Sequence, residues 1–414
     1  MELGPILPLR EQAEIRNGWL RERLDTLIPA LMAQAGLDMW LVIAREYNED
    51  PVVMTLLPEP EMAARRRTIL VFARRSDGGA DRLTISRYGL RGLYEAVWDP
   101  AVEDQYACLA RIVREREPQS IGVNISETFA FGDGLSQSEH GRLAAALGPE
   151  MMARVRGAEG MAVGWLEQRI PAELERYPEL VAIGHRLIAK LFSRAVISPG
   201  STTTDDAVWW LRQTMHDHGL RAWFQPTITV QAPGQPFDMD NGRKLIMSGD
   251  LLHVDVGFHY LGLATDQQQH AYVLKPGEQA APAGLQAGLA AGNRLQDILI
   301  GAMRVGKTGN QVLAEALAQA RAEGLRPSIY THPLGYHGHA AGPTIGLWDR
   351  QDGVPGAGDY PLFDQTCYSI ELNVTHTVEE WDTMDVRFAL EEDALLHDGS
   401  MSWLDGRQEQ LHLI

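Results

Sequence analysis

Two aspartates in one largely apolar stretch are the residues of this 414-residue chain whose type and spacing most suggest chemistry. Asp255 follows the run 251–254, and Asp266 lies beyond a turn signal at Tyr260-Leu261-Gly262. A two-residue turn made of Tyr260 and Leu261 predicts a hairpin that places the aspartates directly opposite each other, with Cβ atoms about 4.5–5.5 Å apart. Such a pair destabilises an apolar strand unless one carboxyl is protonated or a cation lies between them. A register shifted by one residue would instead turn one aspartate to solvent, and the hairpin alone does not decide between these interpretations.

Three later segments add further candidate metal ligands. They are a histidine among small residues in Gly338-His339-Ala340-Ala341-Gly342, an acid in the strand-like context Tyr368-Ser369-Ile370-Glu371, and the acidic pair Glu391-Glu392 after the run 386–390. One histidine with four carboxylates is a hard, oxygen-rich set that suits two divalent ions such as Mn²⁺, Co²⁺ or Zn²⁺. The charges also balance, because the negative charges of four carboxylates equal the positive charges of two dications.

The last acidic ligand is ambiguous between Glu391 and Glu392. Side chains alternate along a strand, which keeps Arg387, Ala389 and Glu391 on one face and turns Glu392 to the other. We therefore predict that Glu391 is the ligand.

Four other histidines lie close to these candidates in the sequence. His253 and His270 share strand parity with the two aspartates, so either could face the site. His332 and His337 precede His339, and His337 could replace His339 as the ligand, although the His-x-x-Gly spacing favours His339. A single histidine of this kind is more often structural than catalytic.

In their order and spacing, the candidate ligands resemble the five metal ligands of the pita-bread metallopeptidases. This family includes methionine aminopeptidase, Xaa-Pro aminopeptidase and prolidase, with creatinase as a metal-free relative. The resemblance covers roughly residues 175–414. The preceding part of the chain resembles the extra domain of the proline-specific branch.

The resemblance implies a role for each ligand. Asp255 would hold one ion and His339 with Glu371 the other, while Asp266 and Glu391 would bridge both. The ions would activate a water for attack on a peptide carbonyl, with Glu371 as general base and then acid. One ion would also anchor the free amine of a small peptide substrate, which restricts such enzymes to single-residue removal or to dipeptides.

Two auxiliary histidines of this family are absent from their usual positions. One would lie near position 238, where the chain reads Pro236-Phe237-Asp238, and the other would follow the His-x-x-Gly motif, where it reads Pro343-Thr344-Ile345-Gly346. We predict that His332 and His337 replace them as catalytic side chains. His253 and Arg387 are the predicted substrate-binding residues.

The elements that must position these residues fall into two predicted domains. Residues 1–165 alternate helical and strand patterns, with a helix over 10–35 and strands over 39–43, 68–72, 83–86 and 120–124, which indicates a smaller α/β domain. Residues 166–414 begin with a helix over 179–194, just after Tyr177-Pro178.

The second domain also contains a weak internal repeat. Residues 197–202 lead into a helix that ends at Gly219-Leu220, and residues 304–308 lead into another that ends at Gly324-Leu325. We therefore predict an α+β chain whose C-terminal domain is a duplicated α/β unit of the pita-bread, creatinase-like type.

Composition bounds the partners and the compartment. The 37 basic and 55 acidic side chains give a formal charge of −18 and argue against a nucleic-acid partner. Cys108 and Cys367 suit a reducing compartment, and the sequence shows neither a leader pattern nor a membrane-length apolar run. We expect a cytoplasmic protein without membrane partners, and the resemblance implies a homodimer.

The leading hypothesis is thus a metal-dependent exopeptidase that hydrolyses Xaa-Pro bonds. The missing auxiliary histidines motivate a second hypothesis, a catalytically silent binding protein on the same fold. A third is a creatinase-like hydrolase that acts on a small C–N substrate without metal. Metal titration separates the first hypothesis from the other two.

Overall fold

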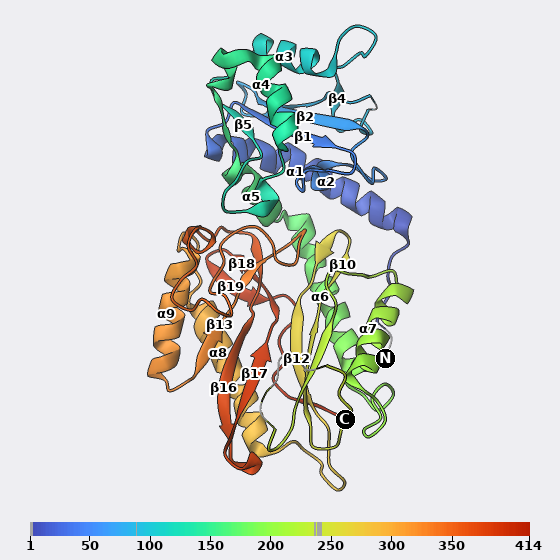
Figure 1. Cartoon of the computed structure of the whole chain (residues 1–414), viewed down its shortest axis with the longest axis vertical. Coiled ribbons are helices and arrows are strands. Elements are labelled where there is room, and N and C mark those ends of the chain that lie inside the picture. The colour runs from blue at the N-terminus through green and yellow to red at the C-terminus, as the bar shows by residue number, and fades with distance from the viewer. Residues whose placement is uncertain (1–2, 88, 236, 238–241) are drawn as a thin grey trace. The chain divides into compact units, whose positions relative to one another are not determined.

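The structure is a computed structural model that describes residues 3–87, 89–235, 237 and 242–414 (Figure 1). The chain divides into two compact units, one over residues 7–170 and the other over 171–414 together with the beginning of the chain up to Ile6. The predicted boundary at 165 lies inside helix α5 (Glu159–Glu167), and the units separate shortly after that helix ends. Within the described residues, no helix has both the length and the apolar character needed to cross a membrane.

The smaller unit is built on one mixed six-stranded sheet with the order β4-β3-β2-β1-β5-β6. Its strands are β1 (Met39–Arg45), β2 (Arg67–Arg74), β3 (Ala80–Thr84), β4 (Glu95–Ala96), β5 (Ile121–Val123) and β6 (Val155–Gly157). Its helices are α1 (Leu9–Ala35), α2 (Val53–Leu56), α3 (Gln105–Arg116), α4 (Gln137–Met152) and α5. Residues of α3 and α4 pack in one core cluster with alternate residues of β1 and β2, such as Leu41 and Val71, so these two helices cover one face of the sheet.

The described residues of the larger unit form α-helices around several short sheets. The helices are α6 (Pro171–Leu191), α7 (Thr204–Asp217), α8 (Ala283–Ala302) and α9 (Gly309–Ala322). The strands are β7 (Arg221–Ala222), β8 (Thr227–Gln231), β9 (Leu251–Val256), β10 (Phe258–Tyr260), β11 (Leu263–Ala264), β12 (Gln267–Tyr272), β13 (Pro327–Ile329), β14 (His332–Leu334), β15 (Thr366–Ser369), β16 (Leu372–Val378), β17 (Met384–Leu390), β18 (Asp393–His397), β19 (Ser400–Trp403) and β20 (His412–Leu413). Figure 1 shows α6 with α7 and α8 with α9 on opposite sides of the strands. The predicted α+β class with a duplicated second half is confirmed.

The duplication is visible in the ends of α7 and α9. Thr203 and Thr308 cap these helices, and each accepts the N–H of the third helical residue while that residue's side chain accepts the cap's own N–H. Gly219 and Gly324 follow the helices with φ of 73° and 80°. The next residue, a leucine in both copies, then donates its N–H to a helix carbonyl five residues earlier, which is the geometry that a left-handed glycine permits.

Helix α6 begins earlier than predicted, which corrects the expected start at 179. Pro171 occupies its first position, where a missing N–H costs nothing, and Pro178 lies inside the helix. Tyr177 explains why the helix continues past Pro178, because this side chain is fully buried and its hydroxyl donates to the carbonyl of Ala264 at 2.8 Å. Tertiary packing here outweighs the tendency of proline to end a helix.

The hairpin that carries the two aspartates has a different register from the predicted one. Leu261 and Gly262 both have positive φ, 54° and 80°, and therefore form the two central residues of the turn. The pairing moves with the turn, so that Asp255 lies opposite Gln268 instead of Asp266. The shift is an even number of residues, which leaves the two aspartates on one face as diagonal neighbours.

The contact between α6 and β12 provides a test of how the helix layer supports the site. A Cβ on Gly184 would overlap the side-chain oxygen of Gln267, which is fully buried next to Asp266. We expect Gly184→Ala to lower the free energy of unfolding by about 1–3 kcal/mol in urea denaturation.

Gly301→Ala is the matched control. This glycine is exposed in α8 and a Cβ there meets nothing within 4 Å, so the change should raise stability by about 0.4–1 kcal/mol. Equal effects of the two substitutions would contradict the close approach of α6 to β12.

Candidate metal centre

Acidic side chains from three parts of the larger unit converge on one point. Asp255 is the penultimate residue of β9, Asp266 precedes β12, and Glu391 lies between β17 and β18. The carboxylate oxygens of these three residues come within 4.8 Å of one another. A backbone bridge between Gln268 and Glu391 ties the hairpin to this third segment. Glu371, just before β16, joins the cluster through His332.

His332 is the histidine that faces these carboxylates. Its Nε2 lies 3.8 Å from Asp266 Oδ2, 4.0 Å from Glu371 Oε2 and 3.5 Å from Glu391 Oε1. The side chain is 3% exposed, so this nitrogen is directed into the protein. Three carboxylates and one imidazole around a shared centre form a set that can coordinate a divalent ion.

His339, the predicted histidine ligand, lies beside His332 at the rim of the cluster. His339 belongs to one possible ligand group, together with Asp266 and His332, and it is the exposed member of that group. Its ring centroid is 4.7 Å from that of His332, 5.1 Å from Trp223 and 5.8 Å from Tyr330. The geometry therefore places His332 among three carboxylates and His339 among aromatic rings.

Burial and mutual repulsion dominate the electrostatics of the cluster. Burial, together with the charge of Glu391, raises the pKa of Asp255, of Asp266 and of Glu371 well above the usual value for a carboxyl group. Asp255 Oδ1, Asp266 Oδ1 and His332 Nε2 are buried atoms without a hydrogen-bond partner among the described residues. Unpartnered acceptors in a cluster of acids fit a bound cation, and the residues present therefore suit the divalent ions predicted from the sequence.

A chain of hydrogen bonds fixes one more side chain in the cluster. Gln268 Nε2 donates to Glu371 Oε1 at 3.0 Å and to Glu391 Oε2 at 2.5 Å. Its Oε1 lies 2.9 Å from His253 Nε2, and His253 Nδ1 lies 3.4 Å from the Thr229 hydroxyl. Burial lowers the pKa of His253, so the ring is neutral, donates from Nε2 and holds the amide with its N–H groups toward the acids.

His253 therefore contacts the cluster through Gln268, although it is a predicted substrate-binding residue. His270 lies opposite His253 on the hairpin and is fully buried, with its ring 5.5 Å from that of Phe388. His337 is half-buried, and it belongs to none of the possible ligand groups among the described residues.

Arg387 is a positively charged residue that influences the acids electrostatically. It lowers the pKa of both Asp255 and Glu371, in opposition to burial. Its guanidinium carbon lies 5.5 Å from the ring centroid of Phe237. Phe237 belongs to the segment where the family's auxiliary histidine was expected, and its neighbours Pro236 and Asp238 lie outside the described residues.

Glu392 belongs to a separate buried network. Its Oε2 lies 2.6 Å from His185 Nε2, and its Oε1 accepts hydrogen bonds from Gln269 Nε2 at 2.8 Å and from the Gln408 N–H at 2.9 Å. His185 Nδ1 lies 2.8 Å from Asp405 Oδ2. Glu391 and Glu392 thus face opposite ways, Glu391 toward His332 and Glu392 toward α6, as the expected alternation requires.

The sequence does contain a signal for His332 that the first interpretation missed. His332-Pro333-Leu334-Gly335 has the same His-x-x-Gly spacing as His339–Gly342. If His332 opens the motif, His339 becomes the second histidine that normally follows it. In that case no auxiliary histidine is expected in the segment Pro343–Gly346, and its absence there needs no explanation.

The model of metallopeptidase family M24 matches residues 178–396, which is more than half of the chain. The chain therefore belongs to metallopeptidase family M24. No curated protein sequence matches it closely enough to count as a relative.

Solved structures share the fold over almost the whole chain. The X-Pro aminopeptidase from Thermotoga maritima MSB8 has a TM-score of 0.65 at 16% identity and covers 93% of this chain and 100% of its own. The Xaa-Pro dipeptidase from Bacillus anthracis has a TM-score of 0.63 at 16% identity, with 98% and 100% covered. The dipeptidase PepE from Mycobacterium ulcerans has a TM-score of 0.63 at 18% identity, with 96% and 98% covered. At such identities the likeness shows the fold alone.

The network around Glu392 predicts a pH-dependent stability. Burial alone would lower the pKa of His185, but its bonds to Glu392 and Asp405 outweigh burial and raise the pKa to about 9. A histidine whose pKa is higher in the folded state stabilises the fold below its unfolded pKa near 6.5, and loses this effect as the pH rises through about 9. We expect His185→Gln to lower the free energy of unfolding by about 2–3 kcal/mol at pH 6 and by much less at pH 9.5.

Urea denaturation at the two pH values measures this difference. His376→Gln, on the partly exposed strand β16, is the control and should change stability little at either pH. An equal loss for His185→Gln at both pH values would show that the charged imidazole does not stabilise the network.

Proposed function

We propose that this chain is a metal-dependent exopeptidase that hydrolyses Xaa-Pro bonds with two divalent ions. One observation carries the proposal: four acids converge with His332 in one cluster, in which Asp266, Glu391 and His332 are buried. Bound cations would balance the negative charge of this cluster. Membership of family M24 supports a metallopeptidase. The X-Pro aminopeptidase and Xaa-Pro dipeptidase among the structural neighbours support the choice of substrate.

In this proposal the ligands are Asp255, Asp266, Glu371, Glu391 and His332. His332 takes the place that the sequence-based prediction gave to His339, because it lies within 4 Å of oxygens from three of the acids. His339 becomes a substrate-facing residue at the rim. Mn²⁺, Co²⁺ and Zn²⁺ all suit such a donor set, since it combines carboxylates with one imidazole.

When bound, the ions would supply Lewis acidity and activate water for attack on the peptide carbonyl. Glu371 is the best placed general base and acid, because its side chain is 19% exposed while those of Asp266 and Glu391 are 4% and 1% exposed. Gln268 holds the Glu371 carboxylate by a hydrogen bond from its Nε2. Arg387 offers a cation to the carboxylate end of a small peptide.

The ligand assignment predicts which substitutions remove metal. Glu391→Gln and His332→Asn should each lose at least one of two ions, because each deletes a donor from the buried cluster. Glu392→Gln and His339→Asn are the matched controls and should keep both ions. Equilibrium dialysis followed by elemental analysis measures the content, and circular dichroism checks folding. Loss of metal from the controls with retention in the first pair would reverse the assignment.

Activity against Xaa-Pro peptides tests the proposed reaction. With added Mn²⁺, the protein should release proline from Ala-Pro or cleave the first bond of Ala-Pro-Ala, and it should act poorly on Ala-Ala. Chelation should abolish turnover and metal should restore it. His339→Asn should lower kcat while two ions stay bound.

The alternatives give different results in the same experiments. A protein that binds two ions and cleaves none of these peptides would rule out the proposed peptidase. A protein that binds no metal and cleaves neither these peptides nor creatine would be a silent binding module. A protein that binds no metal and hydrolyses creatine would be a creatinase-like hydrolase. The four clustered acids favour the peptidase, because a silent module has no reason to keep them.

We further propose that the protein acts on a small peptide substrate, has no nucleic-acid or membrane partner, is located in the cytoplasm and forms a homodimer. The formal charge of −18 supports the first exclusion. Light scattering of the purified chain measures the oligomeric state directly.

A further inference from the structure

The smaller unit contains a pocket of about 370 Å³ whose wall is rich in arginine. Arg65, Arg66, Arg67 and Arg87 line it, and Glu46 is the single acid in its wall. The three consecutive arginines lead into β2, and Arg87 follows β3. The pocket thus concentrates positive charge, although the formal charge of the whole chain is −18.

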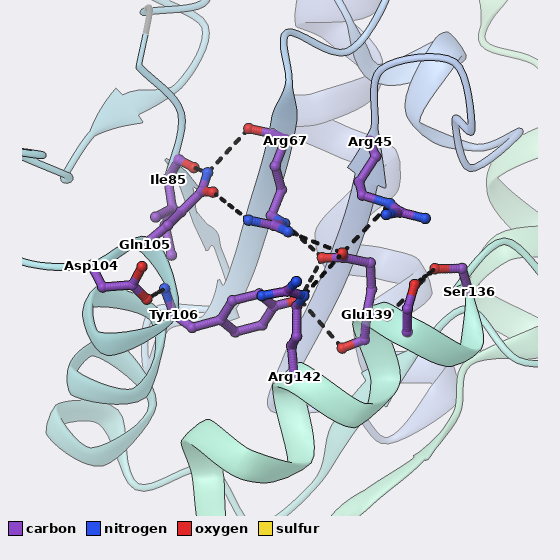
Figure 2. A network of polar contacts seen from close by, with 10 residues as sticks. Arg45, Arg67, Ile85, Asp104, Gln105, Tyr106, Ser136, Glu139 and Arg142 are labelled. Atoms are coloured by element: carbon purple, nitrogen blue, oxygen red, sulfur yellow. Dashed lines mark hydrogen bonds and ion pairs between the residues drawn. The ribbon is translucent and has the colours of Figure 1, made fainter.

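Arg67 forms a fixed part of this wall. Its Nε donates to Glu139 Oε2 at 2.6 Å and its Nη2 donates to Glu139 Oε1 at 3.1 Å. Figure 2 shows Arg45 and Arg142 directed at the same carboxylate, with Nε to Oε1 distances of 3.5 and 3.8 Å. Glu139 is buried, and its one negative charge meets three guanidinium groups. The cluster behind the pocket therefore keeps a positive excess.

Arg66 and Arg87 add charge at the exposed side of the pocket. Both residues are exposed, and among the described residues neither forms an ion pair with an acid. Asp104, another acid near Arg67, is engaged as the cap of α3, where it accepts the N–H of Tyr106 at 2.9 Å. Guanidinium groups arranged in this way match the paired oxygens of a phosphate group.

Trp98 and Gln105 complete the pocket. The indole N–H of Trp98 donates to the carbonyl of Glu103 at 2.9 Å, so the ring is held by its polar edge. Gln105 Nε2 donates to the carbonyls of Arg67 and Ile85, which joins the start of α3 to β2 and to the segment after β3 (Figure 2). An immobilised aromatic face is the type of surface on which a nucleobase stacks.

We propose that this pocket binds a nucleoside phosphate, with its phosphates on the arginines and its base against Trp98. The volume is within the range of roughly 300–1,000 Å³ found for small-molecule sites. Arg67 is fixed, Arg66 and Arg87 form no ion pair with an acid among the described residues, and Trp98 adds an aromatic wall. Together these features favour a flat ring joined to several negative charges over a simple anion. The site lies entirely within residues 7–170 and does not depend on the proposed peptidase reaction.

Isothermal titration calorimetry of the full-length, metal-loaded protein with ATP, pyrophosphate and adenosine tests the proposal. We expect ATP to bind more tightly than pyrophosphate and adenosine to bind weakly. The double substitution Arg66→Gln and Arg87→Gln should weaken ATP binding at least tenfold. Trp98→Leu should bring the affinity for ATP down to that for pyrophosphate. Arg10→Gln with Arg21→Gln, two exposed arginines of α1, is the charge-matched control and should bind ATP like the unmodified protein.

Three outcomes would overturn the proposal. The first is absence of ATP binding at millimolar concentration. The second is unchanged ATP binding after loss of Arg66 and Arg87, which would place the phosphates elsewhere, for instance on metal. The third is binding of hexaglutamate without binding of ATP, which would identify the pocket as a docking site for an acidic protein segment.

Discussion

Repulsion among four clustered acids, two of them buried and two partly buried, is the constraint on which the larger unit depends. Asp255 and Asp266 lie on one hairpin, whereas Glu371 and Glu391 come from segments much later in the chain. Burial raises the pKa of the first three acids. The protein itself supplies few compensating groups. The positive charge of Arg387 opposes the rise in the pKa of Asp255 and Glu371, Ser369 donates to Glu391 at 2.7 Å, and Gln268 donates to two of the acids. The hydrogen bonds from Ser369 and Gln268 orient the carboxylates without neutralising them. Two dications would supply the missing positive charge, and the surrounding fold keeps the acids close enough to share them.

The fold imposes this proximity through backbone geometry. The turn at Leu261-Gly262 sets the register that leaves Asp255 and Asp266 on one face, and the bridge between Gln268 and Glu391 fixes a second segment against the hairpin. On the other side of this segment, Glu392 is held by His185 and by hydrogen bonds from the Gln269 side chain and the Gln408 backbone N–H. Adjacent residues of one segment thus serve opposite purposes, since Glu391 faces the site and Glu392 anchors the backbone that carries it.

Much of this arrangement is predictable from the sequence because it rests on local patterns. Capped helices that end in Gly-Leu predict the duplication, and strand parity predicts which of Glu391 and Glu392 faces the aspartates. The turn was misplaced by one position, since Tyr260-Leu261 and Leu261-Gly262 both look like turn residues and only the positive φ of Leu261 and Gly262 distinguishes them. The start of α6 was missed because the burial of Tyr177, a tertiary effect, overrides the proline signal. The choice between His332 and His339 also depends on tertiary structure, because both satisfy His-x-x-Gly and only the packing shows which one lies among the acids.

The central claim is that the acid cluster exists to hold two cations. Native mass spectrometry of the intact chain titrated with Mn²⁺ measures this most directly. We expect saturation at two ions per chain, with a large increase in melting temperature at saturation, because the bound ions remove the repulsion between the clustered acids. A chain that stays free of metal at saturating Mn²⁺, with an unchanged melting temperature, would contradict it.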